Sequence, residues 1–426
     1  MIEKVIYRIE EVVWGPQFLL LFIFLGIYLS IKLKVPQLKT LRAICKVKNK
    51  KSEGITSFKA LMTILAGTLG IGNIAGVATA IMIGGIGSIF WIFISGIVAM
   101  AISYAENYLV LKYRKKDKTN GYFGGAMYIL DEIMGRRKVA VLFCIFTLIA
   151  TIGMGAMVQA NSFTEILSEE LGIDKNIFAC AVAVISAYVI FGGKQKMANI
   201  YGFVIPFCTL TYVILCGVVI INNFSMLREA IMNILKCAFG IKQVVGGILG
   251  VSIMKCMSIG FSRGMFSNEA GMGSAPMFSA TTEDMEDITK EAYIMSFSVF
   301  VDTIFLCTLT GLTIVVSGAY KISNVAVMLE MTFGIVPFGS MLLVICISVF
   351  AIATIPCWEF YGEQVLKYLF KKRYSVYLYK IIYVICVYIG CVLSLNIVWS
   401  VSNTANALMA LPNLYMIFAL RKELSG

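Results

Sequence analysis

Two glycine-rich segments interrupt long apolar stretches of the chain. The first runs from Ala66 to Gly76 with the sequence AGTLGIGNIAG, and the second runs from Gly260 to Pro276 with the sequence GFSRGMFSNEAGMGSAP. Each glycine inside a helix costs about 1 kcal/mol relative to alanine, so these clusters favour unwinding. Unwound backbone exposes amides, which attract an anion, and carbonyl oxygens, which attract a cation. The sequence therefore predicts two breaks whose backbone atoms can bind charged groups.

Tight packing is the alternative explanation for one such segment. Small residues four apart, such as Gly72 and Gly76, often mark only a close contact between helices. Two segments at matching positions favour a binding site instead, because unwound backbone in a membrane is tolerated only where it lines a cavity or is buried in protein.

The composition is that of a membrane protein. Of the 426 residues, 59% are hydrophobic and 14% are charged, and the mean hydropathy is +0.86, whereas soluble domains are about half apolar and a quarter charged. The net charge of +12 comes from short basic runs between apolar stretches, which is typical of loops beside a membrane rather than of a nucleic-acid-binding face. The chain has no histidine, which argues against zinc, haem and a Ser-His-Asp triad.

The apolar stretches long enough to cross a bilayer, roughly 17–25 residues each, predict about eleven transmembrane helices. The expected spans cover residues 17–34, 57–83, 86–112, 139–166, 176–191, 200–221, 244–272, 293–318, 337–366, 379–395 and 401–420. We therefore expect an all-α polytopic membrane protein.

These spans divide into one N-terminal helix and two groups of five with opposite orientation. Such a pair of groups is the architecture of inverted-repeat transporters, in which the first helix of each group is broken near the membrane midplane. The two glycine-rich segments lie in those two helices. We expect an N-terminal helix and basic loop over residues 1–56, a first five-helix repeat over 57–221, and a linker with the second, inverted repeat over 222–426.

Basic residues gather in the loops on one side of the expected spans, and the positive-inside rule assigns that side to the cytoplasm. We therefore expect a multi-pass protein of the cell (plasma) membrane with its N-terminus outside and its C-terminus in the cytoplasm. The basic residues are Lys39, Arg42, Lys46, Lys48, Lys50, Lys51, Lys112, Arg114, Lys115, Lys116, Lys118, Arg136, Arg137, Lys138, Lys194, Lys196, Lys367, Lys371, Lys372 and Arg373.

Both glycine-rich segments resemble the signature motifs of the alanine/glycine:cation symporter family. That family is similar in fold to the LeuT-type transporters, and the run from Gly70 to Asn73 also resembles their first-helix motif. The resemblance implies a LeuT-like inverted repeat with two broken helices. Supporting motifs cover most of the chain: Trp14-Gly15-Pro16, Tyr104-Ala105-Glu106, Gly124-Gly125-Ala126-Met127-Tyr128, Gln159-Ala160-Asn161-Ser162, Asp302-Thr303 and Tyr361-Gly362-Glu363.

The resemblance also implies a substrate site at the breaks. By this likeness the amides of Ile71 and Gly72 face a substrate carboxylate, with Asn73 beside it. Phe261, at the second break, and Trp358 are candidates for the pocket wall, although Trp358 fits a packed core aromatic almost as well. The full set of candidate substrate-binding residues is Thr68, Gly70, Ile71, Gly72, Asn73, Gln159, Phe261, Ser262 and Trp358.

A sodium site is implied next to the first break. Its expected ligands are mostly backbone carbonyls, and the candidate residues are Ala66, Leu69, Phe350, Ala353 and Thr354. The family usually shows Ser-Thr where this chain has Ala353-Thr354, so one hydroxyl ligand is missing here.

Ionisable residues inside the expected spans are costly and are functional candidates by default. Asp302 is the most central of them, and it fits either a partner for a cation or a hydrogen-bonding tie between helices. Arg263 and Glu269 flank the second break and fit either a gate pair or a structural tie. Glu106, Glu359 and Glu363 lie towards helix ends and are expected to be interfacial.

These features predict a secondary active transporter rather than an enzyme. We expect sodium-coupled symport of small neutral amino acids (alanine, glycine or serine) by alternating access. The alternatives are a proton-coupled symporter of the same fold, with Asp302 or Glu269 as the proton carrier, and a channel. No cofactor is expected beyond sodium as the coupling ion. The expected surroundings are the lipid bilayer, with no nucleic-acid partner, and the sequence does not predict an oligomeric state.

Overall fold

The computed structural model describes residues 2–44, 54–117, 121–171, 174–240, 253–370, 372–393 and 396–425. Almost every described residue belongs to a helix, and one two-stranded antiparallel hairpin, β1–β2, is present among them. Several basic loop residues and the beginning of the expected span at 244–272 lie outside the described residues; the loop residues are Lys46, Lys48, Lys50, Lys51, Lys118 and Lys371.

The first half of the chain contains α1 to α12. Their bounds are α1 Ile2–Val13, α2 Pro16–Lys32, α3 Pro36–Ile44, α4 Ser57–Thr68, η1 Ile71–Asn73, α5 Ala75–Gly84, α6 Ser88–Lys112, β1 Lys115–Asp117, β2 Gly121–Phe123, α7 Ala126–Tyr128, η2 Ile129–Ile133, α8 Arg137–Ala150, η3 Thr151–Val158, α9 Gln159–Leu171, α10 Lys175–Ile190, α11 Gly193–Asn222 and α12 Phe224–Ala238.

The second half contains α13 to α20. Their bounds are α13 Ile253–Asn268, α14 Ala275–Ser279, α15 Ile288–Val299, η4 Phe300–Cys307, α16 Thr308–Val316, η5 Ala319–Lys321, α17 Val325–Phe333, α18 Gly339–Leu369, α19 Arg373–Val392, α20 Asn396–Ala419 and η6 Arg421–Glu423. The segments η2, η3 and η4 are π-helical turns inside longer helical runs.

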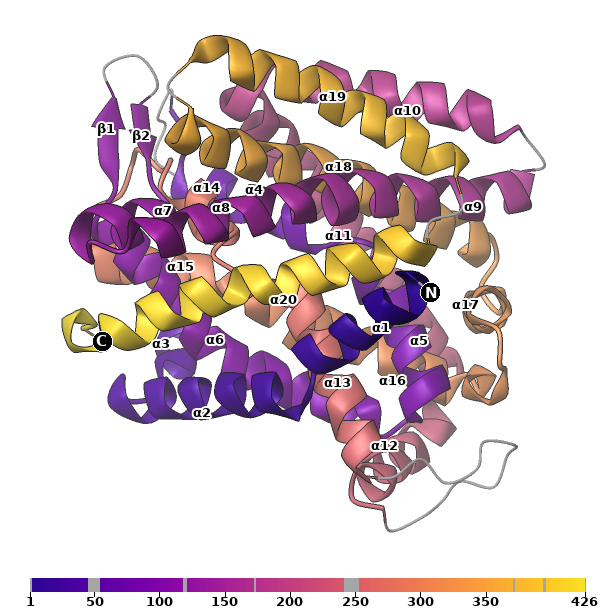
Figure 1. Cartoon of the computed structure of the whole chain (residues 1–426). Helices are drawn as coiled ribbons and strands as arrows, with labels where there is room; N and C mark the ends of the chain where they lie inside the picture. The colour runs from indigo at the N-terminus through magenta and orange to yellow at the C-terminus, as the bar shows by residue number, and fades with distance from the viewer. Residues whose placement is uncertain are drawn as a thin grey trace.

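Seven helical runs among the described residues are long and apolar enough to cross a membrane. Two shorter apolar helices, α5 and α10, have 10 and 16 residues. The polytopic all-α fold is thereby confirmed, while the count of eleven spans stays a prediction. The two ends of the helical assembly differ: α1 and α17 lie at one end, with the N-terminus, and the β1–β2 hairpin and the C-terminus lie at the other (Figure 1).

Both predicted helix breaks are present. The helix α4 ends at Thr68, and the chain passes through the short turn η1 before α5 begins at Ala75. The helix α13 ends at Asn268, and α14 begins seven residues later at Ala275. In the second break Gly271 and Gly273 have φ of +80° and +77°, a left-handed conformation that glycine adopts without the steric cost of a Cβ atom.

Each half of the second broken helix packs against one half of the first. The half-helix α13 contacts α5 and η1, and the half-helix α14 contacts α4, while α6 contacts both α13 and α14. The long helix α18 covers the first break, with contacts to α4, η1, α9 and η3. This arrangement places the two breaks next to each other in the interior, where unwound backbone is shielded from lipid.

The contact between α13 and α6 depends on Gly260, and its replacement provides a first test. A Cβ atom at Gly260 would lie 2.5 Å from Trp91 Cβ and 2.6 Å from the Ser88 carbonyl oxygen. We expect Gly260→Leu to destabilise the protein by about 1–3 kcal/mol through overpacking, measured as a lower thermal unfolding midpoint in detergent. Gly217→Leu is the matched control, since no atom lies within 4 Å of a Cβ there. Equal midpoints for the two variants would contradict this packing.

Candidate functional site

Four oxygen atoms converge where α18 crosses the first break. The Thr354 Oγ1 atom lies 3.0 Å from the carbonyl oxygen of Ala66, 3.5 Å from that of Leu69 and 2.9 Å from that of Phe350. Thr354 is buried, as are the three residues that supply the carbonyls. The structure thus brings together four of the five residues predicted for the sodium site.

The three carbonyl oxygens and the Thr354 hydroxyl are suited to bind a small hard cation, because the hydroxyl proton alone cannot satisfy them. A threonine hydroxyl has one proton to donate, so it cannot satisfy three carbonyl oxygens at once. Lone pairs therefore remain available, and unwound backbone carbonyls of this kind coordinate sodium in inverted-repeat transporters. Ala353 is buried next to Thr354 and contributes no side-chain oxygen.

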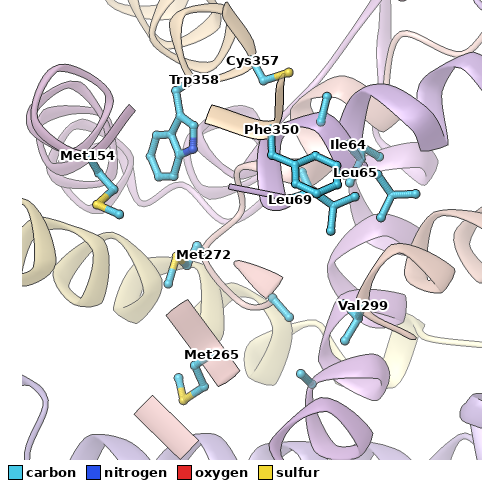
Figure 2. Packing of buried hydrophobic residues seen from close by; sticks show 14 of the residues in the cluster. Ile64, Leu65, Leu69, Met154, Met265, Met272, Val299, Phe350, Cys357 and Trp358 are labelled. Atoms are coloured by element: carbon cyan, nitrogen blue, oxygen red, sulfur yellow. The ribbon is translucent and has the colours of Figure 1, made fainter. Parts of the chain in front are cut away.

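The surroundings of the cluster are apolar. Ile64, Leu65, Leu69 and Phe350 pack together at the first break, and Trp358 and Met154 lie beyond them (Figure 2). An apolar shell strengthens every electrostatic interaction inside it, so a cation bound here would be held mainly by the four oxygens.

A cavity of about 590 Å³ adjoins the first break. It begins at the break and extends along α5 and α13 towards α1 and α17. The lining residues are Glu10, Ile71, Gly72, Ala75, Gly76, Thr79, Met154, Gln159, Ser162, Glu165, Arg263, Phe266, Val325, Ala326, Leu329, Trp399, Ser400 and Asn403.

The inner end of the cavity has both hydrogen-bond donors and a hydrogen-bond acceptor without partners in the described structure. Ile71 and Gly72 are the first residues of η1, where backbone amides have no partner within the turn, and neither amide bonds to another segment of the described chain. The Gln159 Oε1 atom is buried and has no hydrogen-bond partner among the described residues. A carboxylate can accept from the two amides, and an ammonium group can donate to Gln159.

Gly70 joins the cavity to the oxygen cluster. A Cβ atom at Gly70 would lie 3.1 Å from Gln159 Oε1 and 3.3 Å from Thr354 Oγ1. Gly70 therefore lies between Gln159, which lines the cavity, and Thr354, which belongs to the oxygen cluster. A side chain at this position would therefore crowd both Gln159 and Thr354.

Other predicted site residues lie outside the cavity lining. Phe261 packs against Trp91 of α6, with ring centroids 6.1 Å apart, and neither Phe261 nor Ser262 lines the cavity. Phe266 takes this role at the second break, and one of its ring atoms lies 3.6 Å from a Cβ built at Gly72. This placement differs from the sequence prediction.

Thr68 and Trp358 are also absent from the lining. The Thr68 hydroxyl is directed at the Leu65 carbonyl, 3.4 Å away. Trp358 is buried outside the cavity lining, and Gly155 packs against its Cβ atom. The core-aromatic interpretation of Trp358 therefore agrees with its position.

Asn73 and Asp302 connect the first break to the second. The Asn73 side-chain amide donates to Asp302 Oδ1 at 2.5 Å, and the Ser267 hydroxyl, at the end of α13, donates to Asp302 Oδ2 at 2.8 Å. Thr303 donates to the same Oδ2 atom at 2.6 Å. Asp302 lies in the π-helical turn η4, and such turns occur frequently at functional sites. Asp302 therefore acts as a hydrogen-bonding tie between the two breaks.

Arg263 and Glu269, the charged residues on either side of the second break, have different surroundings. Arg263 lines the cavity, whereas Glu269 is buried and accepts a hydrogen bond from Ser274 at 2.8 Å. No ion pair joins Arg263 to Glu269 in the described structure. The described structure therefore does not join these two residues to each other.

The acids expected to be interfacial differ in their surroundings. Glu106 is fully buried and holds the second break by accepting a hydrogen bond from the Gly273 amide at 3.1 Å. Glu359 is buried as well, whereas Glu363 forms an ion pair with Lys380 at 2.6 Å. Neighbouring helices therefore cover Glu106 and Glu359, while the position of these acids near the membrane interface stays a prediction.

Polar contacts close the end of the assembly that carries the β1–β2 hairpin. The Ser57 amide, at the start of α4, donates to Asp284 at 2.8 Å, and the Ser57 hydroxyl donates to Glu291 at 2.8 Å. The Arg114 guanidinium donates to the Thr282 carbonyl at 2.5 Å. The loop before α15 is thereby fixed to α4 and α6.

Comparison with solved structures identifies the fold. The chain matches a structure of MhsT in complex with L-phenylalanine with a TM-score of 0.62 at 11% identity, over 87% of this chain and 90% of that one. It matches a Na⁺-coupled sialic acid symporter with a TM-score of 0.58 at 14% identity, over 90% and 82% of the two chains. These are transporters of the LeuT fold, so the present chain has that fold.

Sequence comparison gives the family. The model of the sodium:alanine symporter family matches residues 1–425. The chain is 35% identical to the sodium/alanine symporter AgcS of Methanococcus maripaludis over 98% of this chain and 94% of that protein. It is 30% identical to the probable sodium/glutamine symporter GlnT of Bacillus subtilis over 99% and 89%.

The chain therefore belongs to the sodium:alanine symporter family. This membership confirms the resemblance found in the glycine-rich segments, and it makes the protein a multi-pass membrane transporter of the sodium-coupled amino-acid symporter class, not an enzyme.

Gly72 provides a test of the inner cavity. A Cβ atom fits there, since its nearest neighbour is the Phe266 ring at 3.6 Å, but a leucine side chain would extend into the cavity beyond it. We expect Gly72→Leu to remain folded and to weaken amino-acid binding by more than about tenfold, or about 1.4 kcal/mol, measured by equilibrium binding in detergent. Gly72→Ala should retain measurable binding, and Gly217→Leu should bind normally. Unchanged binding by Gly72→Leu would place the ligand elsewhere.

Proposed function

We propose that the protein couples inward sodium flow to the uptake of a small neutral amino acid: alanine, glycine or serine. One observation carries this proposal: the oxygen cluster at Thr354 and the free amides of Ile71 and Gly72 belong to the same helix break. The cluster is suited to a cation, and the amides together with Gln159 are suited to a zwitterion.

The shared break supplies a physical basis for coupling. Sodium bound by the carbonyls of Ala66 and Leu69 would fix the backbone that immediately precedes Gly70 and η1. An amino acid that binds the η1 amides would then meet an already ordered segment and lose less conformational entropy. Such coupling is reciprocal, so the amino acid would also raise the affinity for sodium.

The proposed substrate size follows from the inner end of the cavity. Phe266 faces Gly72 across a short gap, which leaves room for a small side chain near the proposed carboxylate position. The relative named as a sodium/alanine symporter supports alanine. Another relative is named as a probable sodium/glutamine symporter, so residues of the cavity wall, rather than the break itself, are expected to set the size limit.

The proposal also includes the orientation of the protein in the membrane. With the N-terminus outside, the end that carries α1 and α17 faces the exterior, and the hairpin end faces the cytoplasm (Figure 1). The cavity then extends towards the exterior, and the contacts of Ser57 with Asp284 and Glu291 close the cytoplasmic side. This corresponds to an outward-facing conformation in an alternating-access cycle.

Uptake of radiolabelled alanine into proteoliposomes tests the proposed function. We expect an inward sodium gradient at constant pH to drive accumulation, choline to abolish it, and unlabelled glycine and serine to compete better than leucine. Accumulation driven by a pH gradient without sodium would favour the proton-coupled alternative. No uptake of any amino acid by a folded protein would overturn the proposal.

Thr354 tests the proposed sodium site. Thr354→Val preserves the shape of the side chain but removes its oxygen, so we expect the half-saturating sodium concentration for uptake to rise about tenfold, or about 1.4 kcal/mol. Thr354→Ser keeps the hydroxyl and should stay close to the wild type. Ala353→Ser should lower the half-saturating concentration if its added hydroxyl reaches the cation. A sodium dependence that none of these variants alters would exclude this cluster as the coupling site.

A further inference from the structure

A short helix, α3, follows the first helical run of membrane-crossing length. The run Arg8–Lys32 is long and apolar enough to cross a bilayer, and α3 begins four residues after it, at Pro36. Lys34 and Val35 make the turn between them with φ of +55° and +56°. Because this connection is so short, α3 lies at the membrane surface, at the end of the assembly that carries the C-terminus (Figure 1).

One face of α3 is anchored in the protein. The residues on this buried face are Pro36, Thr40 and Ala43. The hydroxyl of Thr40 is hydrogen-bonded to that of Ser296 in α15 at 2.9 Å, and the Gln37 side-chain amide donates to the Ile97 carbonyl of α6 at 2.9 Å. A displacement of α3 would therefore act directly on α6 and α15.

The opposite face of α3 combines apolar and basic side chains. Leu38 is 57% exposed and Leu41 is 36% exposed, and Arg42 is exposed beside them. With 3.6 residues per turn, these three side chains lie within about 100° of the helix circumference, on the side away from Thr40. Lys34 is exposed at the turn that precedes the helix.

The two cations on this face have no protein partner in the described part of the chain. Neither the Lys34 ammonium nor the Arg42 guanidinium forms a hydrogen bond or an ion pair with a described residue. Other lysines are paired: Lys112 with Glu423 at 3.0 Å, and Lys115 with Glu132. The positive charge on α3 is therefore available to a ligand outside the protein.

An apolar stripe of α2 leads to these cations. Four large side chains spaced along one face of α2 are exposed: Leu20, Phe24, Ile27 and Ile31. The stripe ends at Ile31, three residues before Lys34. Acyl chains can lie along such a stripe, and an anionic headgroup at its end meets the cations. A phospholipid with net negative charge offers both parts.

We propose that the exposed face of α3, together with the adjoining stripe of α2, binds an anionic phospholipid of the surrounding leaflet. Lys34 and Arg42 receive the headgroup phosphate, which the guanidinium can bind through two parallel hydrogen bonds. Leu38 and Leu41 insert at the boundary between headgroups and acyl chains, as in other interfacial amphipathic helices. In the proposed orientation this is the cytoplasmic leaflet, which carries anionic lipid. The inference goes beyond the proposed function and does not depend on the transported substrate.

Lipid binding to the purified full-length protein in detergent tests the proposal, with bound molecules counted by native mass spectrometry. We expect phosphatidylglycerol to bind more tightly than phosphatidylcholine, and added salt to reduce this preference. The double variant Lys34→Gln/Arg42→Gln should weaken phosphatidylglycerol binding by about fivefold for each cation removed, or about 1 kcal/mol each. Its affinity for phosphatidylcholine should stay unchanged, whereas Leu38→Gln should weaken the binding of both lipids.

Arg136→Gln/Arg137→Gln is the matched control, because it removes the same charge from another exposed position, at the start of α8. This variant should retain the wild-type affinity for phosphatidylglycerol, and thermal unfolding midpoints in detergent check that every variant is folded. Equal losses in the two charge variants would indicate a general charge effect and overturn the site. Equal affinities of the wild type for the two lipids would also overturn it.

A water-soluble anion and a failure of transport give separate results. Glycerol 3-phosphate has the phosphate without acyl chains and should not displace bound phosphatidylglycerol. Displacement would assign the cations to a soluble anion and overturn the lipid site. Because lipid binding is measured without transport, loss of sodium-driven uptake would count against the proposed function alone.

Discussion

Backbone amides and carbonyls without partners are expensive in the interior of a membrane protein, and this chain carries two interrupted helices there. The cost is limited by placing the breaks side by side: α13 packs on α5 and η1, α14 packs on α4, and α18 covers the first break. The unpaired amides of Ile71 and Gly72 belong to residues that line the cavity. The candidate ligand groups are therefore mostly main-chain atoms, and the packed helices around them hold them in position.

Asp302 is the main hydrogen-bonding link between the breaks. One carboxylate oxygen accepts from Asn73 of the first break, and the other accepts from Ser267 of the second. Glu106 has a similar role at the second break, where it accepts from the Gly273 amide and the Asn413 side chain. Because each buried acid receives donors from two or three elements, a movement of either break would disturb the other. Two half-helices linked in this way can shift together, as alternating access requires.

The cavity and the closed end have different chemistry. The closed end is held by polar contacts to main-chain groups, such as those of Ser57 and Arg114, which can break and re-form as hydrogen bonds with water. The cavity instead keeps unpaired groups within reach of a ligand. A transporter needs both properties, since one side must be sealed while the other binds, and here the cavity and the polar contacts lie at different parts of the same broken helices.

The membrane class, the two breaks and the family could all be predicted from the sequence, because they depend on local composition: apolar length, clustered glycines and motifs of consecutive residues. The residues of the Thr354 cluster were predicted as well, and the structure brings them together. The face of α13 that meets the cavity, in contrast, depended on tertiary packing. Phe261 and Phe266 are five residues apart, roughly 140° around a helix, so one contacts Trp91 and the other contacts the cavity. The surroundings of Asp302 and Arg263 likewise depended on which distant helices enclose them, and no local pattern encodes that.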